Sequence, residues 1–162
     1  MSMAEPPTPG ANTVQFASVR IIAEDLQPLV RFYTAVTGAV AQWLTDDFVE
    51  LVTPSATVAI SHSRRVSFLG EDSARAAANK NVIYEFLVKD VAASFSRLQA
   101  DFGEDLTVVQ SLTMMPWGNM SLLIRDPDGA LLNLYTPVTP EALELQQRRQ
   151  PQLPNGQADD KV

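Results

Sequence analysis

The sequence predicts an α+β fold in which one chain of 162 residues contains two βαβββ modules. The first observation is a repeat of strand, Asp, amphipathic helix and Gly, at 20–38 and again at 85–103. The second is that a hairpin-like segment with a Pro in its turn follows each helix, at 48–62 and 121–135. The third is composition, because 46% hydrophobic and 19% charged residues are typical of a globular protein with a sizeable core.

The two helices of the repeat keep a constant spacing. Asp25 and Asp90 are 65 residues apart, and so are Gly38 and Gly103. Each Asp suits a helix N-cap, and each Gly suits the left-handed residue that ends a helix. Apolar residues at helical spacing predict one buried face on each helix. These residues are Leu26, Leu29, Val30, Tyr33 and Val36 in the first helix, and Val91, Phe95, Leu98 and Phe102 in the second.

The remaining elements are predicted from alternation and turn residues. One further strand is expected before each hairpin, near 39–44 and near 106–112. The turn Asp126-Pro127-Asp128-Gly129 predicts a tight hairpin, since a leucine-rich strand follows where a calcium loop would need a bidentate Glu. Thr139 suits the N-cap of a last helix.

The expected domain organisation follows from these elements. The modules are placed at 13–63 and 82–137, with a connector at 64–81 that contains one short helix near 72–79. A C-terminal helix is expected at 138–149. The ends, at 1–12 and 150–162, are rich in Pro and polar residues and are predicted to be disordered tails.

Composition excludes several classes of function. There is no Cys, which excludes disulfides and thiolate sites, and the single histidine, His62, excludes a site with two imidazoles in one chain. The net charge of −7 argues against a nucleic-acid partner. No apolar run approaches the roughly 20 residues that span a bilayer, and the N-terminus does not read as a secretion signal. We therefore expect a cytoplasmic protein with no membrane partner.

The repeat resembles the vicinal oxygen chelate superfamily, which includes glyoxalase I, extradiol dioxygenases, fosfomycin resistance enzymes and bleomycin resistance proteins. The resemblance covers about residues 13–137 and depends on EDLQPLVRFYTAVTG (24–38), VKDVAASFSRL (88–98) and, most specifically, MPWGNMSLLIRDPDGALLNLYTP (115–137). It implies that the two modules meet edge to edge. Their eight strands would then form a curled mixed sheet around a ligand cavity, with the helices outside.

The resemblance also implies where a metal site would lie. Counting from the helix caps and from the hairpin turns gives four equivalent strand positions: Ser18, Ile60, Ile83 and Asn133. Metal-binding members have His or Glu at such positions, whereas a hydroxyl, two isoleucines and an amide cannot hold a divalent ion. We therefore expect no metal and no cofactor. The Asn133 amide then either binds a ligand or water in the cavity, or bonds only to neighbouring protein groups.

Other polar residues are expected on the inward faces of the strands. Arg20 and Glu85 are 65 residues apart, which predicts an ion pair at the junction of the modules rather than a catalytic Glu85. His62, two residues beyond Ile60, is expected on the same inward face, and Glu50 is expected beside Phe48. A lone His near a strand end is more often a surface or satisfied residue than a base.

Aromatic and thioether side chains complete the expected pocket, and such groups suit a planar organic ligand. For the pair Met114 and Met115 a plain core role is also open. The full expected ligand-binding set is Phe16, Ser18, Arg20, Trp43, Phe48, Glu50, Ile60, His62, Ile83, Glu85, Met115, Trp117, Asn133 and Tyr135.

The function expected from the resemblance is metal-independent binding of a small organic molecule by a homodimer, as in bleomycin resistance proteins, including sequestration of an antibiotic. No catalytic residue is assigned. One alternative is a metal-dependent lyase, isomerase or dioxygenase with a displaced site that uses His62, Glu50 and Glu85. Another is a protein with a vestigial cavity that binds a partner protein.

Overall fold

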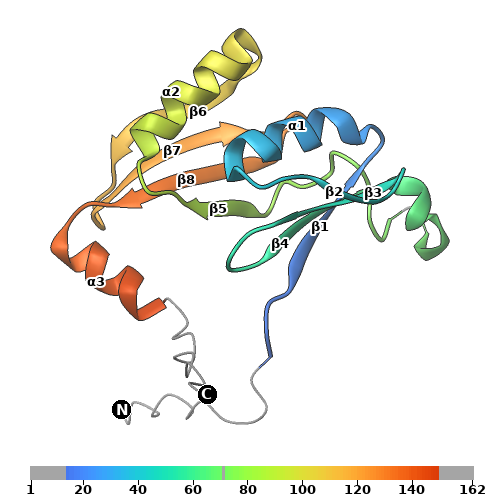
Figure 1. Ribbon diagram of the computed structural model, residues 1–162, viewed down its shortest axis with the longest axis horizontal. Helices are drawn as coiled ribbons and strands as arrows, with labels where there is room; N and C mark the ends of the chain where they lie inside the picture. Colours follow the sequence, from blue (N-terminus) through green and yellow to red (C-terminus); the bar gives the residue numbers. More distant parts are fainter. Residues whose placement is uncertain (1–13, 71, 150–162) are drawn as a thin grey trace, which may run out of the picture. The chain divides into compact units, whose positions relative to one another are not determined.

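The computed structural model describes residues 14–70 and 72–149. The chain divides into two compact units, 1–76 and 77–162 (Figure 1). The predicted tails at 1–12 and 150–162 lie outside the described residues. Among the residues that are described, no helix is both long and apolar enough to cross a membrane.

The first unit contains one βαβββ module. Its elements are β1 (Ser18–Ala23), α1 (Leu26–Thr37), β2 (Gln42–Thr45), β3 (Phe48–Val52) and β4 (Thr57–His62). The strands form one sheet in the order β1-β4-β3-β2, in which β1 and β4 are parallel and the other pairs are antiparallel. Two short 3-10 turns, Ser63–Arg65 and Ser67–Leu69, follow β4.

The second unit repeats this topology and adds a terminal helix. Its elements are β5 (Ile83–Leu87), α2 (Val91–Phe102), a 3-10 turn (Gly103–Asp105), β6 (Thr107–Met114), β7 (Asn119–Arg125), β8 (Leu131–Pro137) and α3 (Pro140–Arg149). The sheet order β5-β8-β7-β6 matches that of the first unit, with β5 parallel to β8. The predicted α+β fold with two βαβββ modules is confirmed. How eight strands would surround a cavity depends on how the units meet, and that stays a prediction.

The predicted helix ends are confirmed in position, but Gly103 ends α2 at φ 53° and ψ −123°, outside the left-handed helical region that was predicted. The Asp25 side chain accepts a hydrogen bond from the Gln27 N–H (3.1 Å), and the Asp90 side chain accepts one from the Ala93 N–H (3.0 Å). Gly38 ends α1 in the left-handed conformation with φ 69°. These caps satisfy backbone groups that have no partner within the helix, so sequence alone locates both helices closely.

One face of each sheet is covered by a helix, and burial follows the predicted periodicity. Leu26, Leu29, Val30, Tyr33 and Val36 of α1 are all buried, and so are Val91 and Leu98 of α2. The other two residues of the predicted face of α2, Phe95 and Phe102, are only half-buried. Strand residues under the helices are buried as well, including Ile21, Val49, Leu51, Leu122, Ile124, Leu132 and Leu134. The face of each sheet that points away from its own first helix, α1 or α2, is called its open face below.

The two hairpins that end the modules differ in loop length. In the first unit Val52 pairs with Thr57 across four loop residues, 53–56. In the second unit Arg125 pairs with Leu131 across five, 126–130. The Asp126 Oδ1 accepts hydrogen bonds from the N–H groups of Asp128 and Ala130, both 2.9 Å, which stabilises the longer loop.

The helix predicted near 72–79 in the connector is wrong. These residues form turns, and Ala77 adopts a positive φ of 56°. A left-handed residue cannot continue a right-handed helix, so the chain changes direction there.

Candidate functional site

Three rows of side chains cross the open face of the second sheet. Residues directly opposite each other on neighbouring strands project to the same face. The first row is Ile83, Leu131 and Arg125; the central row is Glu85, Asn133 and Leu123; the third row is Leu87, Tyr135 and Ser121. The alternation in β5 and β8 places Tyr84, Phe86, Leu132 and Leu134 on the other face, toward α2.

The central row contains a polar pair. Asn133 lies opposite Glu85, and its Nδ2 donates a hydrogen bond to the Glu85 Oε1 (3.1 Å). The Asn133 Oδ1 is buried and has no hydrogen-bond partner among the described residues. The amide therefore has a protein partner on its donor side, and its acceptor side is left for another group.

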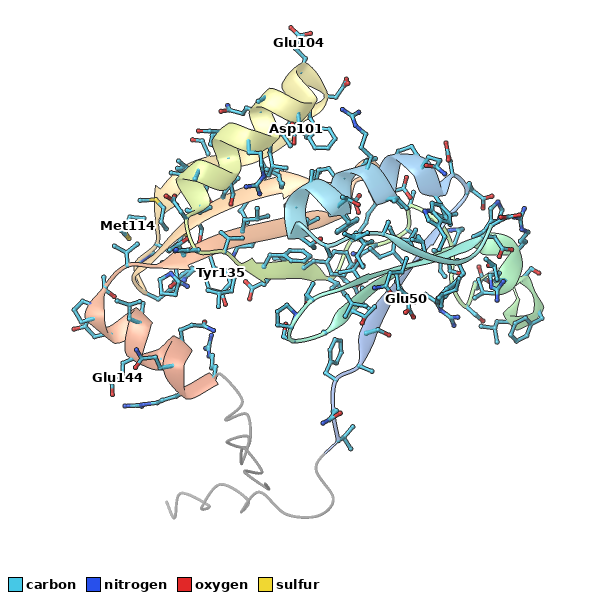
Figure 2. All side chains as sticks on the ribbon, in the orientation of Figure 1. Glu50, Asp101, Glu104, Met114, Tyr135 and Glu144 are labelled. Carbon is cyan, nitrogen blue, oxygen red and sulfur yellow. The ribbon has the colours of Figure 1, made fainter. Side chains whose placement is uncertain are left out.

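The third row contains a second buried polar atom of this kind. Ser121 is 2% exposed, and its Oγ has no hydrogen-bond partner within the described part of the chain. Opposite it on β8, Tyr135 donates from its hydroxyl to the Gln146 Oε1 of α3 (3.2 Å). Burial and the nearby Glu85 carboxylate raise the pKa of the Tyr135 phenol. Figure 2 shows Tyr135 on the side of β8 away from α2.

A cavity adjoins the first row. Its volume is about 270 Å³, and it is lined by Asn79, Lys80, Asn81, Val82, Ile83, Arg125 and Leu131. The turn that leads into β5 forms one wall, where the Val82 N–H donates to the Asn79 Oδ1 (3.2 Å). The open face of the second sheet thus has a hollow beside its first row and buried polar atoms in its central and third rows.

The loop between β6 and β7 carries two residues of the expected pocket. The Met115 N–H donates to the Asn119 carbonyl (2.8 Å), and Trp117 is 60% exposed. Gly118 adopts φ +92°, and a Cβ placed there would lie 2.0 Å from the Thr139 Oγ1. That hydroxyl also caps α3 by accepting from the Ala142 N–H (3.2 Å), as predicted. Glycine is required where the loop passes this cap.

The open face of the first sheet has a different composition. Ser18 and Arg20 lie on it, opposite Thr57 and Ala59 of β4. Glu50 also lies opposite Ala59, on the same face as Phe48, as expected. Phe48 itself lies under the Arg65 guanidinium, which is 5.6 Å from the ring centre. Phe16, which precedes β1, is 71% exposed.

The expected position of Ile60 and His62 on this open face is wrong. Ile60 pairs with Ile21 and His62 pairs with Ala23, on the face that packs under α1. Ile60 is fully buried there. Trp43 is also misplaced, because it lies opposite the buried Val49 and not on the open face. The His62 Nδ1 accepts from the Arg64 N–H (3.1 Å) and so caps the 3-10 turn that follows.

The physical reason for this error is the one-residue difference in hairpin loop length. An offset of 73 residues relates β3 to β7, but after the longer second loop the offset between β4 and β8 is 74. The residue that corresponds to Asn133 is therefore Ala59, not Ile60. A shift of one residue moves a side chain to the opposite face of a strand.

The alternative of a displaced metal site would need His62, Glu50 and Glu85 to lie together. His62 and Glu50 lie on opposite faces of the same sheet. In residues 14–70 and 72–149, no group of three or more His, Asp or Glu side chains could hold a metal ion. A protein zinc site needs at least three such ligands. The described residues do not fit a metal centre.

Sequence reasoning did not select Ser121, Leu123, Lys80 or Arg125. Parity along β7 would have found all of these except Lys80, because Ser121, Leu123 and Arg125 alternate with buried Leu122 and Ile124. The 79–82 turn, which forms the cavity wall and contains Lys80, has no alternation of this kind in its sequence. Its shape depends on the connector, where no periodicity applies.

The predicted Arg20–Glu85 ion pair would join the two units and stays a prediction. Within the second unit, Glu85 has Asn133 as its hydrogen-bond partner.

Two successive βαβββ modules with parallel β1/β4 and β5/β8 pairs define a glyoxalase-like α+β protein. A family model described as the Glyoxalase/Bleomycin resistance protein/Dioxygenase superfamily matches residues 15–134, and the chain belongs to this superfamily. The resemblance drawn from the sequence is thereby confirmed at the level of the family. No curated protein matches the chain.

Solved structures show the same fold at low identity. A glyoxalase/bleomycin resistance protein/dioxygenase from Nocardioides is 15% identical with a TM-score of 0.64, over 81% of this chain and 88% of that one. A family enzyme from Burkholderia phytofirmans PsJN is 14% identical with a TM-score of 0.64, over 76% and 98%. A glyoxalase-related enzyme from Fulvimarina pelagi is 16% identical with a TM-score of 0.63, over 78% and 94%. At these identities the likeness concerns the fold alone.

Proposed function

We propose that the protein binds a small organic molecule on the open face of the second sheet, without a metal ion. The observation that carries the proposal is the pair of buried polar atoms, Ser121 Oγ and Asn133 Oδ1, that have no hydrogen-bond partner among the described residues. Leaving a buried polar group unsatisfied costs about 1–3 kcal/mol. A ligand that bonds to both atoms would recover this cost.

The chemistry of the two atoms restricts the ligand. A carbonyl oxygen such as Asn133 Oδ1 only accepts, whereas the Ser121 hydroxyl can donate or accept. The ligand therefore carries at least one N–H or O–H donor. Apolar side chains beside them, Leu123 and Leu87, supply contact area for an organic body, and Leu87 is 44% exposed. A few polar groups on a largely apolar surface are typical of small-molecule sites.

The biological form of the proposal is sequestration of a small molecule, such as an antibiotic, by a homodimer in the cytoplasm. Glu85 already accepts from Asn133, which suits a positioning role. The proposal therefore assigns no catalytic residue.

The metal-dependent enzyme remains the alternative, and no specific observation favours it. Of the side chains on the three rows of the second open face, Glu85 is the only carboxylate among the described residues. The placement of His62 on the α1 side of the first sheet separates it from Glu50.

The test is mass spectrometry of the purified protein under native conditions, together with metal analysis. We expect a co-purified organic molecule that is lost in Ser121→Ala, and no stoichiometric metal. Ser94→Ala is the matched control, because Ser94 is also a buried serine but lies on α2. One bound metal ion per chain would overturn the proposal, as would equal ligand occupancy in Ser121→Ala and the wild type.

A further inference from the structure

The cavity at the first row has a charge that differs from that of the whole chain. The protein carries a net charge of −7, yet the lining of this cavity contains two cations, Lys80 and Arg125, and no acidic residue. Within the described residues neither cation forms an ion pair. Lys80 and Arg125 are both exposed, so their charges are accessible to a ligand.

Two acidic groups of the second unit, Asp126 and Glu85, are engaged elsewhere. Asp126, next to Arg125 in the chain, is buried and accepts from two backbone N–H groups of its own loop. Glu85, one row further along the sheet, accepts from Asn133. Arg125 donates from one nitrogen to the Gly129 carbonyl (2.8 Å), which holds its side chain at the hairpin and leaves the other guanidinium N–H groups to a ligand.

The rest of the cavity is apolar or amide. Val82 is 46% exposed and Ile83 is 52% exposed, and Leu131 lies beside Ile83 in the same row. Exposed aliphatic side chains next to two cations suit a ligand that has both an apolar body and an anionic group. A guanidinium binds carboxylate and phosphate oxygens through paired N–H groups, and an ammonium adds a point charge.

The wall of the cavity is a hydrogen-bonded turn. Asn79 both accepts from the Val82 N–H (3.2 Å) and donates to the Val82 carbonyl (3.5 Å), so the turn closes on itself. Two residues earlier, Ala77 adopts φ 56°, a conformation that non-glycine residues rarely adopt. Such outliers persist where the surrounding structure holds them, and they cluster at ligand sites.

We propose that this cavity binds the anionic end of the ligand, an organic carboxylate or phosphate with an apolar body. The inference rests on the proposed function, because the first row continues into the central row with Asn133. Two residues along a strand span about 7 Å. An anion at Lys80 and Arg125 and a donor group at Asn133 thus fit one small molecule.

The test uses three probes with the same bicyclic body: 1-naphthoate, 1-naphthyl phosphate and the neutral 1-naphthalenemethanol. Affinities are measured by titration calorimetry at low ionic strength. We expect at least one anion to bind about fivefold or more tightly than the alcohol, and this advantage to shrink with added salt. The ranking of the two anions then assigns carboxylate or phosphate.

The matched variants are Lys80→Glu and Lys89→Glu. Both lower the net charge equally, but Lys89 lies beyond the far end of β5, about 20 Å along the chain from the cavity. Lys80→Glu should reduce the affinity for the preferred anion about tenfold and leave that for the alcohol unchanged, and Lys89→Glu should change neither.

Equal binding of anions and alcohol would overturn the anionic assignment and leave small-molecule binding intact. Equal effects of the two lysine variants, or no binding of any probe, would also overturn it. The proposed function has its own test: it would be overturned if the purified protein contained no bound organic molecule that is lost in Ser121→Ala.

Discussion

The two modules share one topology but differ on their open faces. Across the first sheet, the row of Arg20, Ala59 and Glu50 has charges on both sides of a small residue. The corresponding row of the second sheet is Glu85, Asn133 and Leu123, where the small residue is replaced by an amide that has one unpaired atom. Both open faces contain a buried serine, Ser61 in the first sheet and Ser121 in the second. Among the described residues, however, the buried side-chain atoms without a hydrogen-bond partner lie in the second unit alone.

The loops that support the two faces differ as well. In the first unit, Asp47 joins the β2–β3 turn to the residues after β4 through Arg64 (2.9 Å) and Arg65 (2.7 Å). In the second unit the support is steric, since Gly118 contacts the N-cap of α3. One unit is therefore held by ion pairs at its rim and the other by a close backbone approach.

The largest expected effect comes from Gly118→Ala. The new Cβ would meet Thr139 at 2.0 Å, in a backbone conformation that favours glycine. We expect a loss of about 3 kcal/mol in the free energy of unfolding, measured by urea denaturation. Gly38→Ala in the first unit is the matched control, because the φ of Gly38 is also positive but a Cβ placed there would meet no atom within 4 Å. This substitution should lower the free energy of unfolding by about 1 kcal/mol. Equal losses would contradict the steric account.

Asn133→Asp should have the next largest effect. It places a second carboxylate opposite Glu85 and removes the 3.1 Å hydrogen bond, so we expect a loss of about 2 kcal/mol at pH 7. Glu85→Gln in the same chain should recover most of this loss, because the repulsion is removed. A double-mutant cycle in urea measures the coupling, and a loss that is unaffected by Glu85→Gln would show that the two side chains do not interact.

A smaller, pH-dependent effect is expected at Asp47. Hydrogen bonds from Arg64, Thr45 and Arg65 hold the pKa of Asp47 far below its ordinary value of 3.8. Because the pKa is lower in the folded state, the stabilisation is complete above pH 3.8 and is lost as the pH falls through the folded-state pKa.

Asp47→Asn should therefore lower the melting temperature at pH 7 and have a decreasing effect as the pH drops below 3.8. Asp46→Asn is the control, since Asp46 is exposed and forms no ion pair with the described residues. An effect of Asp47→Asn that does not vary with pH would rule out the ion pairs as its cause.

Much of the fold could be predicted because its signals are local. The caps at Asp25 and Asp90 and the apolar spacing of Leu26 to Val36 depend on neighbouring residues only, and they locate both helices. The face of Asn133 was also predictable from alternation, since leucines precede and follow it. Its bond to Glu85 required the pairing of β5 with β8, which no local pattern contains.

The errors in residue placement arose where one sequence offset was applied to the strands on both sides of a hairpin loop. Proline in both hairpin turns suggested equal lengths, but the second loop is one residue longer, so Ile60 was assigned to the wrong face. The cavity at Lys80 and Arg125 was not found for a related reason, because a connector and a strand end form it together. Register and connector shape depend on tertiary structure.

The central claim is that ligands bind to the open face of the second sheet and not to that of the first. Backbone amide chemical shifts, recorded while a panel of small aromatic fragments is added, test it most directly. We predict that the chemical-shift changes cluster at Ile83, Asn133 and Ser121. We also predict that Ser121→Ala lowers the affinity of the fragments that bind there about threefold to tenfold. Shifts confined to Arg20, Glu50 and Ala59, or no fragment binding at either face, would contradict the account.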